Sequence, residues 1–339
     1  MNKSYQQLIK NFPSLEQNRP LAPFTTFGIG GPAEFFYKLT DIADFEPLMN
    51  TAQELKIPVF ILGGGSNTIF ADEGFRGLVI KMEAKKIALH GEAAIKQPAS
   101  SNNKIVVAES GALLSQVIQF ALKNQLTGME KMMGLPGTIG GAVRGNAGAF
   151  GIETADIFEK ALIYDSEKGL HEISKTELNF GYRTSKIKKS PGSTVLKVYL
   201  KLARAIPAQA KIALAAATDI VKNRISKQPK GKCSGSFFKN PVTPDYAASQ
   251  PPETKAGHLL EQIGAKNMQI GGVKVSSEHA NWLLNVASPA RLGTDSATPP
   301  ATQADVLDLS AKLQKAVKDR FDITLEREVQ LVSADGTLI

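Results

Sequence analysis

Residues 58–68 constrain the fold more than any other stretch, because an apolar run ends there in three consecutive glycines. The run 59–62, Val-Phe-Ile-Leu, is typical of a buried strand. Glycine has no Cβ, so the backbone N–H groups after this strand can turn toward a ligand and approach it closely. The hydroxyl and amide side chains that follow can complete hydrogen bonds to phosphate oxygens. We therefore expect a pyrophosphate-binding loop that consists of Gly63, Gly64, Gly65, Ser66, Asn67 and Thr68.

The residues after this loop do not fit a Rossmann turn. In a Rossmann turn a helix follows the glycines, and its N-terminus faces the phosphates. Here Ile69 and Phe70 lead to Asp72-Glu73-Gly74 and then to a second strand-like run at 77–82. A glycine-rich β-turn without a ligand is the alternative for this stretch taken alone.

Two further glycine-rich stretches favour the ligand-binding interpretation. The first, residues 24–32, reads Phe-Thr-Thr-Phe-Gly-Ile-Gly-Gly-Pro, and its glycines can present backbone to a ligand. The second, residues 134–151, holds seven of the chain's 29 glycines. Pro136 suits the first position of a short helix there, and the small residues Gly140 and Gly141 would admit a large flat group. A tight contact between helix and sheet is the alternative that gives the same pattern.

Length and composition indicate a globular protein of two or three packed units. The chain has 339 residues, of which 42% are hydrophobic and 21% charged, and no run approaches the roughly 20 apolar residues that span a bilayer. The first residues lack the apolar core of a signal peptide. The single cysteine, Cys233, excludes an internal disulfide, and with four histidines it disfavours a structural zinc site. We expect a cytoplasmic protein with neither a metal nor a membrane contact.

The net charge of +8 favours anionic partners. The lysines are dispersed, however, and the densest group, residues 186–189, is short. A polyanionic small molecule explains the charge as well as a nucleic acid does, and no nucleic-acid-binding signature is present.

Periodicity and capping signals predict alternating helices and strands. The first twelve residues are expected to form a short amphipathic helix or a loose lead-in, and residues 83–104 a hairpin-like connection. Asp41 or Asp44 is expected to cap the first long helix, and Asp305 the last. A change to Ala-rich composition places a domain boundary near residue 205. Strands are predicted at 33–38, 59–62, 77–82, 105–109, 158–164, 193–203 and 323–331, and helices at 41–55, 113–124, 207–227, 256–263 and from 305.

Eight short motifs follow one another along the chain from about residue 20 to residue 332. They are Thr-Phe-Gly-Ile-Gly-Gly-Pro, Leu-Gly-Gly-Gly-Ser-Asn, Gly-Leu-Pro-Gly-Thr-Ile-Gly-Gly-Ala-Val, Asn-Ala-Gly-Ala-Phe-Gly, Gly-Tyr-Arg-Thr-Ser, Gly-Ser-Phe-Phe-Lys-Asn-Pro, Gln-Ile-Gly-Gly-Val and Leu-Glu-Arg-Glu-Val. In this order they resemble UDP-N-acetylenolpyruvoylglucosamine reductase, a flavoenzyme that makes UDP-N-acetylmuramate in the cytoplasmic stage of bacterial peptidoglycan synthesis.

The resemblance implies an α+β fold and a set of ligands. Residues 1–20 would lead into an FAD-binding unit of the vanillyl-alcohol-oxidase (PCMH) type at 21–204, with two subdomains at about 21–85 and 86–204. Residues 205–339 would form an α+β substrate-binding domain. FAD would be held non-covalently, NADPH would donate the hydride, and UDP-N-acetylglucosamine-enolpyruvate would be the substrate. We expect a monomer without a nucleic-acid partner.

The resemblance also assigns roles to individual residues. Ser236 matches the family's proton donor, and Arg183 and Glu328 match the two residues that flank the reacting carbons. Substrate contacts would fall on Lys227, Asn240 and His279. The FAD contacts it implies are Gly28, Gly30, Gly63, Gly64, Gly65, Ser66, Asn67, Thr68, Pro136, Gly137, Thr138, Gly140, Gly141, Asn146, Ala147 and Gly148.

Without the resemblance, five of these polar residues have a plainer interpretation. Ser236 would cap a turn, Arg183 would pair with a surface carboxylate, and Glu328 would be a solvated residue of an alternating strand. Lys227 would be a solvated helix end, and His279 a hydrogen-bonded core histidine.

Two stretches depart from the family pattern. The segment between Arg183 and the strand at 193 is short and carries no tyrosine, so the chain resembles the type that lacks the tyrosine-bearing loop. The Pro/Ser/Thr-rich stretch 286–304 is longer than the family usually has, and we expect it to be a mobile loop.

Two other classes of protein compete with this interpretation. Another flavoenzyme of the same FAD-binding type could oxidise an alcohol or a sugar, although the first glycine-rich stretches offer no His or Cys for covalent flavin. A non-enzymatic nucleotide- or nucleic-acid-binding protein has only the basic charge in its favour. Bound flavin would make the purified protein yellow and would separate these classes.

Overall fold

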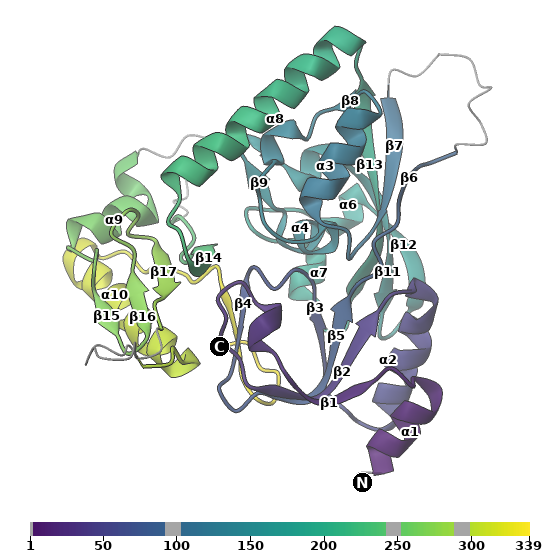
Figure 1. Ribbon diagram of the computed structural model, residues 1–339, viewed down its shortest axis with the longest axis horizontal. Coiled ribbons are helices and arrows are strands. Elements are labelled where there is room, and N and C mark those ends of the chain that lie inside the picture. The colour runs from purple at the N-terminus through teal and green to yellow at the C-terminus, as the bar shows by residue number, and fades with distance from the viewer. Residues whose placement is uncertain (1–2, 92–102, 242–251, 288–298) are drawn as a thin grey trace, which may run out of the picture.

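The computed structural model of the chain describes residues 3–91, 103–241, 252–287 and 299–339, and these residues form three packed parts (Figure 1). Residues 92–102 of the predicted connection at 83–104 and residues 288–298 of the predicted loop at 286–304 lie outside the described residues. The observed mixture of helices with parallel and antiparallel strands is the predicted α+β class.

The first part is a four-stranded sheet with two helices beside it. The strand order is β1-β2-β5-β3; β5 pairs in parallel with both β2 and β3, and β1 pairs antiparallel with β2. Buried aromatic and aliphatic side chains of the helices, among them Leu8, Phe45 and Leu48, pack with Phe35 and Ile80 of the sheet. The elements are α1 (Lys3–Asn11), β1 (Glu16–Pro20), β2 (Pro32–Leu39), α2 (Phe45–Glu54), β3 (Val59–Leu62), β4 (Thr68–Phe70) and β5 (Phe75–Met82).

The second part is an antiparallel sheet of order β12-β11-β13-β7-β6, with β8 added to β13. Its apolar face packs against α3 and α4, whose buried residues include Val117, Ile118 and Val143. The elements are β6 (Ile87–Leu89), β7 (Asn103–Glu109), α3 (Leu114–Lys123), β8 (Leu126–Thr127), α4 (Ile139–Gly145), β9 (Gly148–Ala149), β10 (Ile152–Glu153), α5 (Thr154–Ile157), β11 (Phe158–Asp165), β12 (Gly169–Ser174), α6 (Lys175–Leu178), α7 (Lys186–Lys189) and β13 (Thr194–Arg204).

The third part is a small antiparallel sheet of order β14-β17-β16-β15 beside two helices. Its core brings Leu259, Val273 and Leu309 together with Phe27 and Ile69 of the first part. The elements are β14 (Lys232–Ser236), α9 (Ala256–Gln262), β15 (Gln269–Ile270), β16 (Val273–Val275), β17 (Trp282–Asn285), α10 (Gln303–Phe321) and β18 (Gln330–Val332). Short 3-10 turns are η1 (Ala22–Phe24), η2 (Ile42–Asp44), η4 (Glu130–Met132) and η5 (Pro252–Thr254).

The end of the chain returns to the first part and fixes the third part to it. β18 pairs in parallel with β4, the strand that follows the three glycines. The buried amide of Gln303 donates to the carbonyls of Ile69 and Val332 at 3.0 and 3.1 Å. The Asp72 carboxylate accepts the backbone N–H of Gln303 at 2.9 Å. Residues far apart in sequence therefore meet beside the glycine-rich loop (Figure 1).

The long helix α8 (Pro207–Lys227) crosses from the second part toward the third (Figure 1). Its two buried residues, Ala213 and Ala217, belong to the core of the second part. The division near 205 stays a prediction, and this packing favours a later division at the end of α8.

Two capping predictions are wrong, and a third is confirmed for one of its two alternatives. Asp44 is the N-cap residue of α2, which begins at Phe45, whereas Asp41 caps the 3-10 turn η2 and accepts from Ala43 N at 3.0 Å. Thr138 rather than Pro136 precedes and caps α4. Thr302 caps α10, and Asp305 completes a reciprocal capping box with it.

The predicted strand 323–331 is also wrong over most of its length. Only Gln330–Val332 form a strand. Before it, Glu328 N donates to Phe237 O at 2.8 Å, and Lys239 N donates to Glu326 O at 2.9 Å. The backbone here bonds to the loop after β14 and then turns to meet β4, so it has no continuous ladder partner.

Candidate active site

One cavity of about 1450 Å³ lies where the three parts meet. Ligand sites of about 300–1,000 Å³ hold a drug-sized molecule, so this cavity has room for more than one such group. Most of the predicted site residues line it. They are Gly63, Gly64, Gly65, Ser66, Asn67, Thr68, Pro136, Gly137, Thr138, Gly140, Gly141, Ala147, Gly148, Arg183, Lys227, Ser236, Asn240 and Glu328.

Four predicted site residues do not line this cavity. Gly28 and Gly30 have φ of +71° and +142°, and a Cβ on them would meet Lys232 and Phe70, so these glycines serve a tight chain turn. Asn146 is buried at the left-handed end of α4, where its amide donates to Glu153 and Gly181. His279 accepts from Asn281 N at 3.1 Å beside Trp282, and burial lowers its pKa. Their predicted ligand contacts stay predictions.

The glycines after β3 lie directly against the glycines before α4. A Cβ on Gly64 would lie 2.7 Å from Gly137 Cα, and a Cβ on Gly63 would lie 2.9 Å from Thr138 Oγ1. Gly65 has φ +66°, and a Cβ there would lie 1.9 Å from Phe24 O, so only glycine fits. Two backbone segments thus form one wall of the cavity with almost no side chains between them.

This wall suits the phosphates of a bound dinucleotide. Bare backbone admits close approach, and the hydroxyls of Ser110 and Ser234, which also line the cavity, are buried with no hydrogen-bond partner among the described residues. Buried hydroxyls normally have a partner, so these two are suited to a polar ligand. The absence of a helix directly after Thr68 confirms that the loop is not a Rossmann turn.

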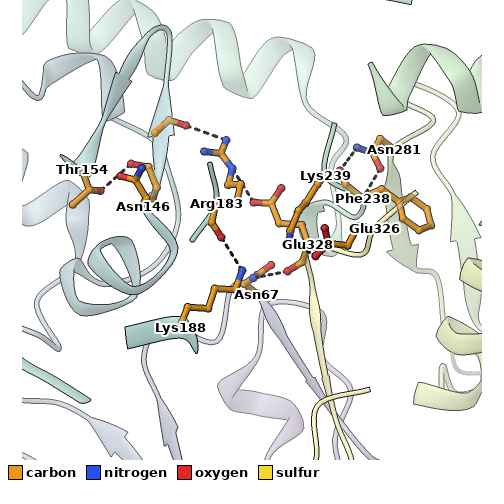
Figure 2. A network of polar contacts seen from close by, with 12 residues as sticks. Asn67, Asn146, Thr154, Arg183, Lys188, Phe238, Lys239, Asn281, Glu326 and Glu328 are labelled. Atoms are coloured by element: carbon orange, nitrogen blue, oxygen red, sulfur yellow. Dashed lines mark hydrogen bonds and ion pairs between the residues drawn. The ribbon is translucent and has the colours of Figure 1, made fainter. Parts of the chain in front are cut away.

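Asn67 connects this loop to the segment that carries Glu328. Its side-chain nitrogen donates to the Glu328 backbone carbonyl at 3.0 Å (Figure 2). The backbone carbonyl of Asn67 accepts Gln330 N at 3.0 Å. The Asn67 side-chain nitrogen is therefore already hydrogen-bonded to the protein. The two hydrogen bonds also fix the position of the glycine-rich loop relative to Glu328.

Arg183 and Glu328 form an ion pair on the cavity wall. Arg183 Nε lies 3.0 Å from Glu328 Oε1, and its Nη2 donates to Gly148 O at 3.3 Å (Figure 2). The two side chains are about a quarter exposed, at 25% and 22%, so they reach the cavity without being fully hydrated. Arg183 itself has φ +55°, a backbone conformation that is uncommon outside glycine and asparagine.

Burial and charge compete at this pair. Burial raises the pKa of Glu328 and outweighs the opposing attraction of Arg183, Lys188 and Lys239. Lys188 has its pKa lowered to about 8, chiefly by burial and then by the nearby charges of Lys239 and Arg144. A carboxyl and an amine with shifted pKa in one cavity are typical of a functional site.

Ser236 ends β14 and lies opposite Trp282 of β17. Its neighbours Phe237 and Phe238 are buried. The Asn281 side chain holds the Phe238 backbone, because its Oδ1 accepts Phe238 N and its Nδ2 donates to Phe238 O, both at 2.9 Å (Figure 2). Because Phe237 O accepts the N–H of Glu328, Ser236 and Glu328 come from adjacent backbone segments. The exposed Ser236 hydroxyl is thus presented to the same cavity.

Several cavity residues were not predicted from the sequence. Arg144 on α4 donates to Gln330 at 3.1 Å, and Arg224 on α8 lies over the Phe150 ring at 5.4 Å. Arg224 Nε is buried and without a partner among the described residues. A basic residue close to a glycine-rich stretch is the sequence feature that could have indicated Arg144. Lysines and arginines are dispersed along the chain, however, and their spacing does not distinguish Arg144 or Arg224 from the others.

Neither a metal cluster nor a membrane span is found in the described part of the chain. No group of three or more His, Cys, Asp and Glu side chains gathers there. None of its helices is long and apolar enough to cross a bilayer.

The comparisons with known proteins agree with the fold and the cavity. Residues 33–172 match the family described as "FAD binding domain". The chain therefore has an FAD-binding domain, and it is an FAD-dependent oxidoreductase. Residues 227–332 match "UDP-N-acetylenolpyruvoylglucosamine reductase, C-terminal domain".

Curated relatives identify the family over the whole chain. UDP-N-acetylenolpyruvoylglucosamine reductase of Clostridium novyi is 32% identical over 99% of this chain and 97% of its own length. That of Desulforamulus reducens is 34% identical, with 97% of each chain covered. The crystal structure of the Thermus caldophilus reductase matches with a TM-score of 0.67 at 27% identity, covering 94% of this chain and 97% of that one. The chain belongs to the UDP-N-acetylenolpyruvoylglucosamine reductase family.

Proposed function

We propose that the chain reduces the enolpyruvyl group of UDP-N-acetylglucosamine-enolpyruvate to UDP-N-acetylmuramate, with NADPH as the hydride donor. Family membership makes the chain a reductase of peptidoglycan precursor synthesis. The observation that carries the finer assignment is the presence of the glycine wall, the Arg183–Glu328 pair and Ser236 on one cavity.

FAD would be held non-covalently against the glycine wall, where it would supply a ring able to accept a hydride from a nicotinamide and pass it to an electrophilic carbon. Backbone N–H groups of Gly63 to Gly65 would bond its pyrophosphate. Ser110 and Ser234 would use their unpaired hydroxyls on its polar atoms.

Arg183 would bind the enolpyruvyl carboxylate and stabilise the negative charge that develops on it as the β-carbon accepts the hydride. Its pairing with Glu328 fixes the guanidinium in the cavity wall. Ser236 would then deliver a proton to the α-carbon. A serine hydroxyl is a weak acid, so it would act within a hydrogen-bonded relay.

Basic side chains of α8 would hold the phosphates. Lys227 and Arg224 lie three residues apart at the end of the helix, and both line the cavity. Asn240 also lines the cavity, and its side-chain oxygen accepts Ala256 N at 3.1 Å. Both NADPH and the sugar nucleotide are polyanions, so one set of cations suits both. His279, which lies off the cavity wall, stays the least supported substrate contact.

The proposal extends to the subtype and to the assembly. The segment after Arg183 is a single helical turn, α7, without a tyrosine, which supports the type that lacks the tyrosine-bearing loop. A cytoplasmic monomer without a nucleic-acid partner remains the expected form, and size-exclusion chromatography with light scattering would measure its mass.

The direct test is product analysis. Purified protein is mixed with NADPH and the enolpyruvyl nucleotide, and the products are identified by mass spectrometry. The proposal expects UDP-N-acetylmuramate and NADP⁺ in equal amounts, and neither without NADPH. Oxidation of alcohols or sugars by O₂, with the enolpyruvyl nucleotide unchanged, would favour the competing oxidase.

A further inference from the structure

Arg183 occupies a strained turn. Gly181 and Thr184 exchange two backbone hydrogen bonds of 3.0 and 3.1 Å, so Tyr182 and Arg183 are the central residues of a two-residue turn. A positive φ at the second central residue ordinarily requires glycine or asparagine. Arg183 has φ +55° there, and strain of this kind persists only where the surroundings hold it in place.

Lys188, which lies outside the turn, stabilises it through a hydrogen bond. Its ammonium nitrogen donates to Arg183 O at 2.9 Å, the carbonyl that the left-handed conformation turns toward α7 (Figure 2). Ser185 and Ile187, which precede Lys188 in the chain, are buried, and Ser185 also donates to Arg144 O at 2.8 Å. The helical turn that carries Lys188 is therefore anchored independently of Arg183.

We propose that Lys188 is a positioning residue for the reduction, because it holds the Arg183 backbone in the conformation that directs the guanidinium toward Glu328 and the cavity. The role in turnover rests on the proposed function, whereas the role in Arg183 conformation does not. Arg183 is held at its carbonyl by Lys188, and at its guanidinium by Glu328 and Gly148.

Charge gives this contact a pH dependence. The groups that face Lys188 are Arg183 of the turn, Arg144 of α4, Lys239 after β14, and Glu328 and Glu326 before β18. Burial, and then the surrounding positive charge of Lys239 and Arg144, lower the pKa of Lys188 to about 8. Above that pH the neutral amine is a weaker donor to the carbonyl, so turnover is expected to fall as Lys188 loses its proton.

The test compares Lys188→Met with Lys189→Met, which removes the same charge from an exposed position of the same helical turn. Lys188→Met is expected to lower kcat about 10-fold to 100-fold with KM changed less than about threefold, since misplacing a catalytic group acts mainly on the chemical step. Lys189→Met is expected to keep both constants. In Lys188→Arg, which stays charged at all accessible pH values, activity is expected to be retained and the fall above pH 8 to disappear.

Crystal structures of the two methionine variants provide a readout that does not depend on turnover. In Lys188→Met, Arg183 is expected to leave φ +55° or its guanidinium to leave Glu328, while Lys189→Met is expected to keep both. An unchanged Arg183 in Lys188→Met, or equal kinetics in the two variants, would overturn the proposal. A wild-type protein that fails to reduce the enolpyruvyl nucleotide would contradict the proposed function alone.

Discussion

Replacing Gly64 by alanine probes the contact between the two glycine-rich segments. The added Cβ would lie 2.7 Å from Gly137 Cα and 3.3 Å from Gly137 C, and both neighbours are backbone. Neither can rotate away, so the segments must separate. Overpacking of this kind costs about 1–3 kcal/mol. If that cost falls on the FAD-binding conformation, FAD affinity drops roughly 5-fold to 150-fold.

The assay is titration of FAD into flavin-depleted protein, followed by flavin fluorescence. Gly77→Ala is the matched control, because its Cβ would lie 2.3 Å from Pro58 O but Gly77 does not line the cavity. We expect Gly77→Ala to lower the melting temperature and leave FAD affinity within about twofold of wild type. Gly64→Ala that folds and binds FAD like wild type would refute the placement of the FAD-binding wall.

Three further substitutions separate the proposed roles. Ser236→Ala should leave reduction of bound flavin by NADPH unchanged and slow its reoxidation by the enolpyruvyl nucleotide about 10²-fold or more; equal slowing of both half-reactions in stopped-flow traces would indicate a structural serine. Lys227→Ala should raise KM for NADPH and for the nucleotide together, because it removes a shared phosphate contact, and an effect on one ligand only would contradict the shared site. Glu328→Gln should lower kcat yet stabilise the fold at neutral pH. Burial raises the pKa of Glu328 in the folded protein. The protonated Glu328 side chain therefore contributes to stability at low pH, and this contribution is lost as the pH rises through the pKa of Glu328 in the folded protein. The variant should therefore have the higher melting temperature at pH 7, with the advantage gone below about pH 4; a wild type that is more stable at both pH values would contradict this reasoning.

The sequence was most informative where backbone geometry leaves a single choice of residue. The run before Gly63 could be recognised as a strand because it is short and continuously apolar, and β3 has the predicted bounds 59–62. The absence of helix signals after Thr68 correctly excluded a Rossmann turn. Gly65 illustrates the physical reason, because a side chain there would meet Phe24 O at 1.9 Å.

Prediction failed where a distant partner decides the local structure. Alternation over 323–331 predicted a strand, yet only Gln330–Val332 find a ladder partner, in β4. Thr302 rather than Asp305 caps α10, since both fit a capping box and the sequence does not say which is outside the helix.

The active-site surroundings were the hardest part to predict. Lys188 is one of several lysines in a short basic segment. Its hydrogen bond to Arg183 depends on a strained turn, and the residue types in that turn do not predict a positive φ at Arg183. Asn67 fits a phosphate-binding loop by composition, but its side chain bonds to Glu328, more than two hundred residues away. Such contacts follow from how the three parts pack, which local patterns do not encode.

We propose that NADPH and the enolpyruvyl nucleotide bind in turn in one cavity, with one ligand bound at a time. NADPH would deliver a hydride there, and the enolpyruvyl nucleotide would then receive it. Anaerobic stopped-flow spectroscopy tests it most directly. NADPH alone should bleach the flavin absorbance, and the enolpyruvyl nucleotide, added after NADP⁺ is removed, should restore it at a rate that supports turnover. Steady-state double-reciprocal plots should then be parallel, as for a ping-pong reaction. Flavin that NADPH does not reduce, or a complex that holds both ligands on one flavin, would contradict the account.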